Sequence, residues 1–237
     1  MDERELLNIS PIDGRYHSKV AELGQYFSEY ALMKFRIYVE VEYFIAMTEL
    51  PIAQLKDFDS DNRGKLRNIY KKFNIDDCQQ IKATEAKINH DVKAVEYFIK
   101  DKFDELGFAK WKEFIHFGLT SQDINNTAIP ISLRDALIDV YAPLLEDLIN
   151  TLSELAIQRT KIPMLARTHG QPASPTMLGK EIRVFIERLS KQRNVFNAIP
   201  FSAKFGGATG NFNAHFVAYP DIDWISFADE FVLEFLI

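Results

Sequence analysis

The stretch YAPLLEDLINTLSEL, residues 141–155, decides the fold. Its apolar residues follow one another at intervals of four, three, four and three positions, the heptad-like spacing of a helix that packs along a narrow seam. Pro143 lies near its start and favours a kink or a break there. The sequence therefore predicts a long helix that packs on other helices. The seam residues are Tyr141, Leu145, Leu148, Leu152 and Leu155.

A second seam of the same kind follows, and two long helices with narrow seams indicate a helical bundle instead of a sheet protein. Pro130, upstream of the first seam, favours another kink or break. Because bundle seams can continue across subunits, we expect a homo-oligomer. The predicted fold class is mainly α. The second seam comprises Leu178, Ile182, Phe185, Leu189 and Phe196.

The flanking segments also have helical patterns. Residues 26–49 are dense in apolar and aromatic side chains and contain no Gly or Pro, which predicts a long, largely buried helix. Residues 57–77 are polar and charged, and they indicate a turn with short solvated helices. Four aromatic residues at helical spacing predict a helix near the C-terminus. They are Trp224, Phe227, Phe231 and Phe235.

Two helix starts can be predicted from capping residues. Asp91 is expected to cap a helix over residues 92–103, which Gly107 ends. Thr120 or Ser121 is expected to cap the next helix. Asp123 would lie in its first turn, where a carboxylate is favoured.

Composition excludes several classes of function. The 237 residues are 47% hydrophobic and 26% charged, as in an ordinary globular protein. The net charge of −6 and the lack of a Lys/Arg stripe argue against nucleic acid as the main partner. No apolar run approaches the roughly 20 residues that span a bilayer. The acidic residues 1–5 lack the apolar core of a signal peptide. A single cysteine, Cys78, fits a reducing cytosol, so we expect a cytoplasmic protein.

The segment RTHGQPA, residues 167–173, is predicted to be a rigid loop between two helices. Gly170 permits positive φ, and Pro172 fixes φ. His169 lies there among hydrogen-bonding groups. Because an unperturbed histidine titrates near neutral pH, His169 is a candidate proton donor. The alternative is a histidine that only hydrogen-bonds a turn.

Other polar residues have both a structural and a functional interpretation. His90 lies at a helix start, where anions bind, or is a solvated neighbour of the cap. His116, between apolar residues, is a satisfied core histidine or a site residue. The Gly-rich residues 204–211 match neither phosphate-binding glycine motif and form a tight turn or a site loop. Cys78 follows two aspartates, which favours a structural thiol over a nucleophile.

Several separated motifs, in order along the chain, resemble those of the fumarase/aspartase superfamily of lyases. RTHGQPA, followed by Gly179-Lys180-Glu181, is the most telling of them. The likeness runs from about Ile9 to the last residue and is nearest to the branch that acts on succinylated purine nucleotides. The other motifs are SPIDGRY (10–16), NHDVKAVEY (89–97), EFIHF (113–117), TSQDINN (120–126) and GNFNAH (210–215).

The resemblance implies a domain division. Residues 1–110 would form an N-terminal helical domain, and residues 111–237 the first part of a central long-helix bundle. The superfamily's flexible Met-Pro loop, which carries the serine taken as the catalytic base, is absent from the sequence. We therefore expect the chain to correspond to the N-terminal half of such an enzyme and to be inactive alone.

The resemblance also implies a chemistry. It is the elimination of fumarate from adenylosuccinate to give AMP, and from the succinyl-carboxamide ribotide of the same pathway, in a homotetramer. No His/Cys cluster has metal-ligand spacing, so we expect no metal and no cofactor. His169 would be the general acid, assisted by His90, and Lys180 would lie near the site. The implied substrate contacts are Arg15, Tyr16, Asn89, His90, Asp91, Thr120, Ser121 and Gln171.

Two other functions stay open. One is a sibling lyase that acts on argininosuccinate, fumarate or aspartate. The combination of Arg15-Tyr16 with Asn89-His90-Asp91 favours the purine branch over it, and AMP binding would discriminate the two. The other is a non-catalytic truncated paralogue or helical interaction module, which the missing base loop supports.

Overall fold

The computed structural model describes residues 7–236, with side chains up to Glu234. Residues 1–5, Ile237 and the side chain of Phe235, named above, therefore lie outside the described part. The chain divides into two compact units, one of Met1–Ala136 with Phe201–Ile237 and one of Leu137–Pro200. The predicted boundary between residues 110 and 111 stays a prediction about the domains of the longer relatives.

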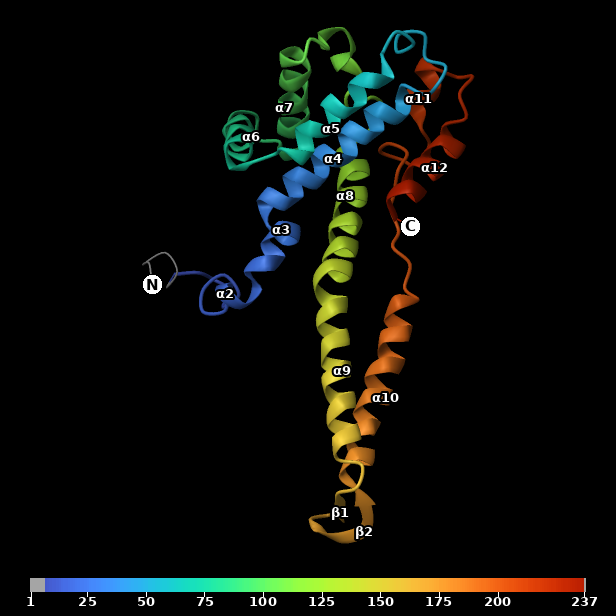
Figure 1. Cartoon of the computed structure of the whole chain (residues 1–237). Coiled ribbons are helices and arrows are strands. Elements are labelled where there is room, and N and C mark those ends of the chain that lie inside the picture. The colour runs from blue at the N-terminus through green and yellow to red at the C-terminus, as the bar shows by residue number, and fades with distance from the viewer. Residues whose placement is uncertain (1–6, 237) are drawn as a thin grey trace. The chain divides into compact units, whose positions relative to one another are not determined.

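The first unit is entirely helical in its described elements (Figure 1). Its longest helix is α4, Glu29–Met47. In chain order the other described elements are α2 His17–Val20, η1 Ala21–Leu23, α3 Gly24–Phe27, η2 Ser60–Asn62, α5 Arg63–Lys71, α6 Ile75–Ile88, α7 Asp91–Glu105, η3 Ala109–Phe114, α8 Ser121–Ala136, α11 Asn213–Ala218 and α12 Trp224–Leu236. Of these, α3, α5, α6, α7 and α8 pack on α4.

Helix α4 confirms the predicted long buried helix. Ser28 caps it, because its hydroxyl accepts a hydrogen bond from the Ala31 N–H at 3.1 Å. The helix is buried on most of its faces, and α5, α7 and α8 all pack on it. The mainly-α prediction and the C-terminal helix are confirmed as well, since Trp224 and Phe231 of α12 are buried against the same core.

The predicted cap of α7 is wrong. His90, not Asp91, is the N-cap, because its ring Nδ1 accepts a hydrogen bond from the Lys93 N–H at 3.1 Å. The carboxylate of Asp91 is instead held by Arg36 of α4. The predicted end of the helix is confirmed, since Gly107 follows Leu106 with φ of +79°.

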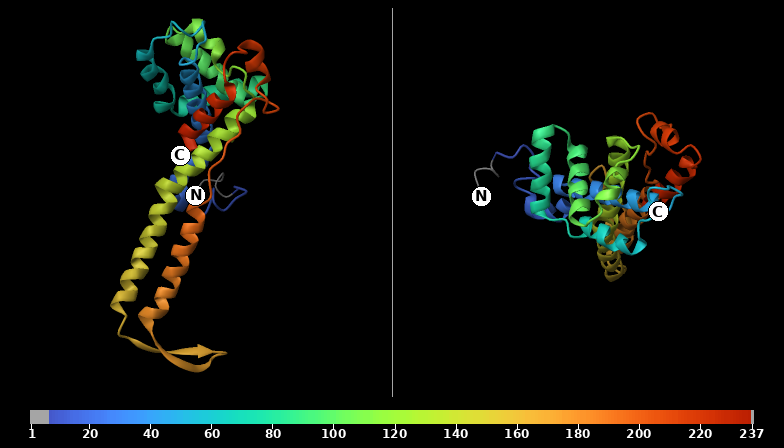
Figure 2. Two further views of the ribbon diagram at one scale, coloured as in Figure 1. Left: turned by 90° about the vertical axis from the view of Figure 1, so that its right-hand side faces the viewer. Right: turned by 90° about the horizontal axis from the view of Figure 1, so that it is seen from above.

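The second unit is a helical hairpin closed by two strands. Helix α9, Ala142–Gln158, and helix α10, Leu178–Asn197, lie side by side (Figure 2). The predicted seams face each other, because the rings of Tyr141 and Phe196 are 5.6 Å apart and Leu145 and Leu189 line the same hollow. The π-helical turn η4, Leu137–Tyr141, precedes Pro143, as expected for a break there. Pro130, in contrast, lies inside α8 and does not end it.

The segment around His169 is not the predicted loop but the tip of a β-hairpin. Strand β1, Pro163–Thr168, pairs antiparallel with β2, Gln171–Met177. The two residues between them have φ of +49° at His169 and +75° at Gly170. Positive φ at both central positions is the signature of a type I′ turn, which matches the twist of paired strands.

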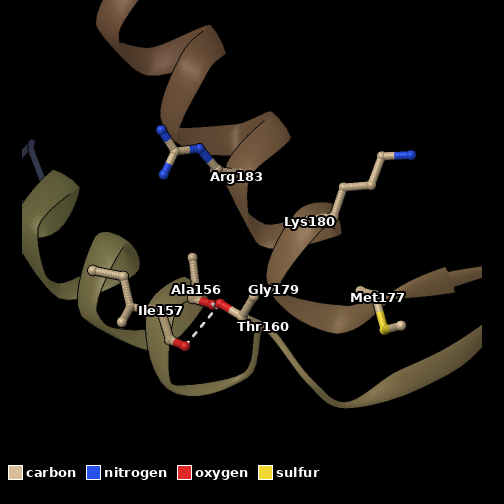
Figure 3. Close-up of a pocket in the computed structure, with 7 residues that line it drawn as sticks. All are labelled: Ala156, Ile157, Thr160, Met177, Gly179, Lys180 and Arg183. Atoms are coloured by element: carbon tan, nitrogen blue, oxygen red, sulfur yellow. Dashed lines mark hydrogen bonds between the residues drawn. The ribbon is translucent and has the colours of Figure 1, made fainter.

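A glycine sets the distance between α9 and α10 (Figure 3). A Cβ on Gly179 would lie 2.3 Å from the carbonyl oxygen of Ala156, so only glycine fits. The hollow beside it, of about 310 Å³, is lined by Ile157 of α9 and by Met177 at the end of β2. Lys180 and Arg183 extend from α10 at its rim.

The second unit leaves much apolar surface uncovered within itself. Leu144, Ile157 and Val195 are 65%, 70% and 63% exposed, far above the exposure of core residues. Among residues 7–236, no helix combines the length and the apolar character needed to cross a membrane.

Candidate functional site

The turn between α6 and α7 presents three of the predicted site residues. Asn89 ends α6 in the left-handed conformation, with φ of +54°, and His90 follows in extended backbone. Since Nδ1 of His90 accepts from the backbone, the neutral ring carries its proton on Nε2. Half of the side chain is exposed, so the ring presents an N–H donor outward.

Asp91 forms an ion pair with a buried arginine of α4. Arg36 is only 5% exposed, and its Nη2 donates to Asp91 Oδ2 at 2.7 Å. Its Nε donates to Asn125 Oδ1 of α8 at 2.8 Å. Burial would raise the pKa of the Asp91 carboxyl, but the Val92 N–H and Arg36 outweigh it and hold that pKa below its ordinary value. Asp91 is therefore anionic at neutral pH.

The capping role of His90 can be separated from any chemical role by two substitutions. His90→Ala should lower the free energy of unfolding by about 1 kcal/mol, as for other lost caps, whereas His90→Asn should retain the cap. Urea unfolding of both variants measures this difference. Equal stability of the two variants would contradict the cap.

Five donors converge on one carboxylate at the start of α8. Asp123, fully buried, accepts from the N–H of Thr120 at 2.7 Å and from its hydroxyl at 2.9 Å. It also accepts from Lys204 Nζ at 2.8 Å and from the N–H groups of Gly206 and Gly207 at 2.9 and 3.1 Å. Lys204 also donates to the carbonyl of Gly207. Burial would raise the Asp123 pKa, but Lys204 and Thr120 outweigh it and keep that pKa low.

These hydrogen bonds give the two predicted contact residues, Thr120 and Ser121, different roles. A hydroxyl has one proton, and that of Thr120 is donated to Asp123, so Thr120 can only accept from a ligand. Ser121 is half-buried at the first position of α8, where a helix N-terminus favours anions. The Gly-rich segment predicted to be a turn or a site loop is thus tied directly to the helix start.

His116 is a half-buried histidine paired with a buried acid. Its Nδ1 lies 2.5 Å from Oε1 of Glu40, which is fully buried, and its backbone is left-handed with φ of +59°. Burial lowers the His116 pKa, but the hydrogen bond and the charge of Glu40 outweigh it and raise that pKa above its ordinary value. The second oxygen of Glu40 has no partner among the described residues.

His215 is a core histidine of the opposite kind. Its Nε2 lies 2.9 Å from the hydroxyl of Tyr43, which donates its own proton to the Phe117 carbonyl at 2.8 Å. Nε2 therefore carries the proton, and Nδ1 is left buried without a partner among the described residues. Burial lowers the pKa of His215 to about 4. A Cβ on Gly118 would lie 2.6 Å from this ring, so the site is tightly packed.

This low pKa predicts a loss of stability in acid. Between its ordinary 6.5 and about 4, the unfolded chain binds a proton at His215 that the folded chain does not. The stabilisation is therefore complete above pH 6.5 and is lost, by about 3 kcal/mol in all, as pH falls toward 4. The raised pKa of His116 has the opposite effect, since its contribution to stability is present in acid and is lost as pH rises through that pKa.

Urea unfolding across this pH range checks the prediction. His215→Leu should remove this part of the pH dependence while leaving that from His116 in place. An unchanged slope in the variant would show that His215 does not titrate as described.

The remaining predicted residues lie elsewhere in the chain. The guanidinium of Arg15 lies over the ring of Tyr16, 5.5 Å from its centre, at the turn before α2. His169 and Gln171 belong to the other compact unit, at the tip of the β1–β2 hairpin, and both are exposed. The structure thus brings together the turn at residues 89–91 and the start of α8 through Arg36, within one unit.

Sequence reasoning missed three residues of α4 that contact these motifs: Arg36, Glu40 and Tyr43. They lie at i, i+4 and i+7, so they share one helix face. Polar residues at that spacing within a largely buried helix are a signal that the sequence carries.

The Cys78 thiol is half-buried against the sulfur of Met33, and burial and the nearby Glu29 raise its pKa, in agreement with a structural thiol. No group of three or more His, Cys, Asp or Glu side chains within residues 7–236 is arranged to hold a metal ion.

Comparison with known proteins gives the family. A family model described as Lyase matches residues 14–232. Adenylosuccinate lyase of Dictyostelium discoideum is 54% identical over 235 residues, which cover 96% of this chain and 50% of that protein. The Escherichia coli adenylosuccinate lyase is 43% identical over 234 residues, covering 98% and 51%. The chain spans about half the length of the curated relatives it matches.

Solved structures agree on the fold. A fumarate lyase from Mesorhizobium superimposes with a TM-score of 0.70 at 20% identity, covering 92% of this chain and 47% of that one. A β-carboxy-cis,cis-muconate cycloisomerase from Acinetobacter calcoaceticus gives 0.67 at 22% identity, covering 91% and 48%. These likenesses show the fold alone. With a family model matched over nearly its whole length, the chain belongs to the lyase family, within the fumarase/aspartase superfamily that its motifs indicated.

Proposed function

We propose that this chain supplies one part of an adenylosuccinate lyase, which eliminates fumarate from adenylosuccinate to give AMP. The same chemistry would apply to the succinyl-carboxamide ribotide. The observation that carries the proposal is the 54% identity to a protein of that name over almost the whole chain. No cofactor is required.

The elimination needs a base, a means of stabilising a carbanion and an acid for the leaving nitrogen. His169 is proposed as the acid, since an exposed imidazole at a rigid turn is free to meet a substrate. His90 would assist as a neutral Nε2–H donor. The serine base that the superfamily carries on a Met-Pro loop is not in this sequence.

The first unit would bind the rest of the substrate. Ser121 and the N-terminus of α8 suit a carboxylate or a phosphate, because free N–H groups and the helix dipole favour anions there. Arg15 and Tyr16 are proposed to bind the nucleotide. Asn89 and Gln171 supply amides. Asp91 stays anionic and would accept from a ligand hydroxyl or N–H group.

We further propose a cytoplasmic homotetramer whose sites combine several subunits. The exposed apolar residues of α9 and α10 support this, since packing against equivalent helices would cover them. The apolar hollow next to Gly179 and Lys180 would lie within such contacts.

A chimera tests the function. The chain is extended with the remaining C-terminal half of the Dictyostelium relative, and fumarate release from adenylosuccinate is measured beside the chain alone. We expect release by the chimera and none by the chain alone. Release from argininosuccinate instead would favour a sibling lyase. An inactive, folded chimera that fails to bind AMP would favour an interaction module.

A further inference from the structure

Three buried polar side chains lie on one face of α4, and together they contact four of the sequence motifs. They are Arg36, Glu40 and Tyr43, here called the α4 polar stripe, with exposed fractions of 5%, 0% and 0%. Their spacing of four and three residues places them in one row along the helix. Groups so deeply buried carry a desolvation cost, which their partners must offset.

Arg36 joins two motifs that are far apart in sequence. Its Nη2 and Nε bind Asp91 and Asn125 at 2.7 and 2.8 Å. The planar guanidinium fixes the direction of both bonds, which a lysine cannot do. As a result, Arg36 fixes the position of the turn that carries His90 relative to the helix that begins at Ser121.

Glu40 and Tyr43 continue the row toward the next two motifs. Glu40 binds the ring of His116, while the Tyr43 hydroxyl binds the carbonyl of Phe117. The same hydroxyl accepts from His215, which is 172 residues away in sequence. These contacts hold the segment just before Thr120 and the helix α11 that follows the Gly-rich segment.

We propose that the α4 polar stripe is the positioning element of the lyase site, which sets the turn at residues 89–91, the segment at 116–120 and His215 relative to one another. These are positioning residues, since they act through the groups they hold. The proposal rests on the function proposed above. Helix α4 carries none of the sequence motifs. In this proposal it nevertheless sets the positions of four of them.

The chain offers a matched control on the same helix. Glu42 is also buried, and it accepts from Arg67 and Tyr70 at 2.8 Å. It faces away from the stripe, because two residues along a helix correspond to about 200° of rotation. Glu42→Gln removes a buried, hydrogen-bonded carboxylate just as Glu40→Gln does, but without a site motif at its end.

The kinetic experiment uses the chimera described above. Arg36→Met, Glu40→Gln and Tyr43→Phe should each lower kcat/KM for fumarate release about 10²-fold, as displaced reacting groups do. Glu42→Gln should leave kcat/KM within about twofold, although its urea midpoint falls with the others. Equal losses in all four variants, or no loss in the three stripe variants, would overturn the proposal.

A spectroscopic experiment on the chain itself keeps the two proposals distinguishable. Nitrogen-15 spectra of the histidine rings should show that Glu40→Gln lowers the pKa of His116, which Glu42→Gln leaves unchanged. Tyr43→Phe should shift the Nε2 resonance of His215 only. If the wild-type chimera releases no fumarate, the proposed function fails, while these shifts still decide the positioning. If Glu40→Gln leaves the pKa of His116 unchanged and Tyr43→Phe leaves the His215 resonance unchanged, the positioning proposal is overturned.

Discussion

Replacing His169 by asparagine should lower kcat of the active chimera about 10²- to 10⁴-fold, the contribution of one positioned acid. The substitution removes the ionisable ring but suits the backbone. His169-Gly170 forms a type I′ turn, and Asn-Gly is the pair most favoured there. The hairpin should therefore stay folded, so the loss would lie in the chemistry and not in the stability.

The comparison with His17→Asn makes this result specific. His17 is exposed at the start of α2 and has no proposed role. Fumarate release and urea unfolding of both variants are measured on the same preparation. Equal activity of the two variants would remove His169 from the mechanism, whereas a lower urea midpoint for His169→Asn alone would show that the turn was damaged.

Replacing Asp123 by asparagine should lower the free energy of unfolding by about 3 kcal/mol, the upper end of the cost when buried donors lose their acceptor. The amide nitrogen would face the N–H groups of Thr120, Gly206 or Gly207, and Lys204 would lose its counter-charge. Because Asp123 joins the start of α8 to the Gly-rich segment, the substitution should also loosen that segment.

Asp104→Asn is the matched control. Asp104 is an exposed acid paired with Lys112 at 2.8 Å, and such surface pairs contribute about 0–1 kcal/mol. Urea unfolding measures the global loss, and amide exchange at Gly206 and Gly207 measures the local one. If Asp123→Asn lowers the free energy of unfolding no more than Asp104→Asn does, the Asp123 carboxylate does not hold the start of α8 and the Gly-rich segment together.

Periodicity predicted the helices well, and tertiary contacts explain most of what it missed. The seams of α9 and α10 follow from spacing alone, and the burial of α4 follows from its density of apolar and aromatic side chains. The N-cap of α7 could not be predicted in this way. Asp91 is the better N-cap by propensity, but its carboxylate binds Arg36, which lies 55 residues earlier in the sequence. A hydrogen bond across that separation leaves no local pattern.

The β-hairpin was missed for a different reason. Its strands contain three prolines, Pro163, Pro172 and Pro175, which usually argue against a strand, and the pairing is that of an isolated, exposed ribbon. Its turn carries histidine where asparagine is the usual signal. The candidate residues themselves came from the motifs, but their division between two compact units could not be predicted from spacing.

Left-handed backbone recurs where the motifs carry polar side chains. Asn89, His116 and His169 all have φ between +49° and +59°. For residues with a Cβ this conformation costs about 1 kcal/mol or more each, less for asparagine, and glycine avoids it. A laboratory evolution experiment that rewards only heat resistance should therefore drift toward glycine or asparagine at His169, whereas His116 is retained as the partner of the buried Glu40. Under the function proposed above, one that rewards fumarate release by the chimera should keep His169, so the two lineages would diverge first at this position.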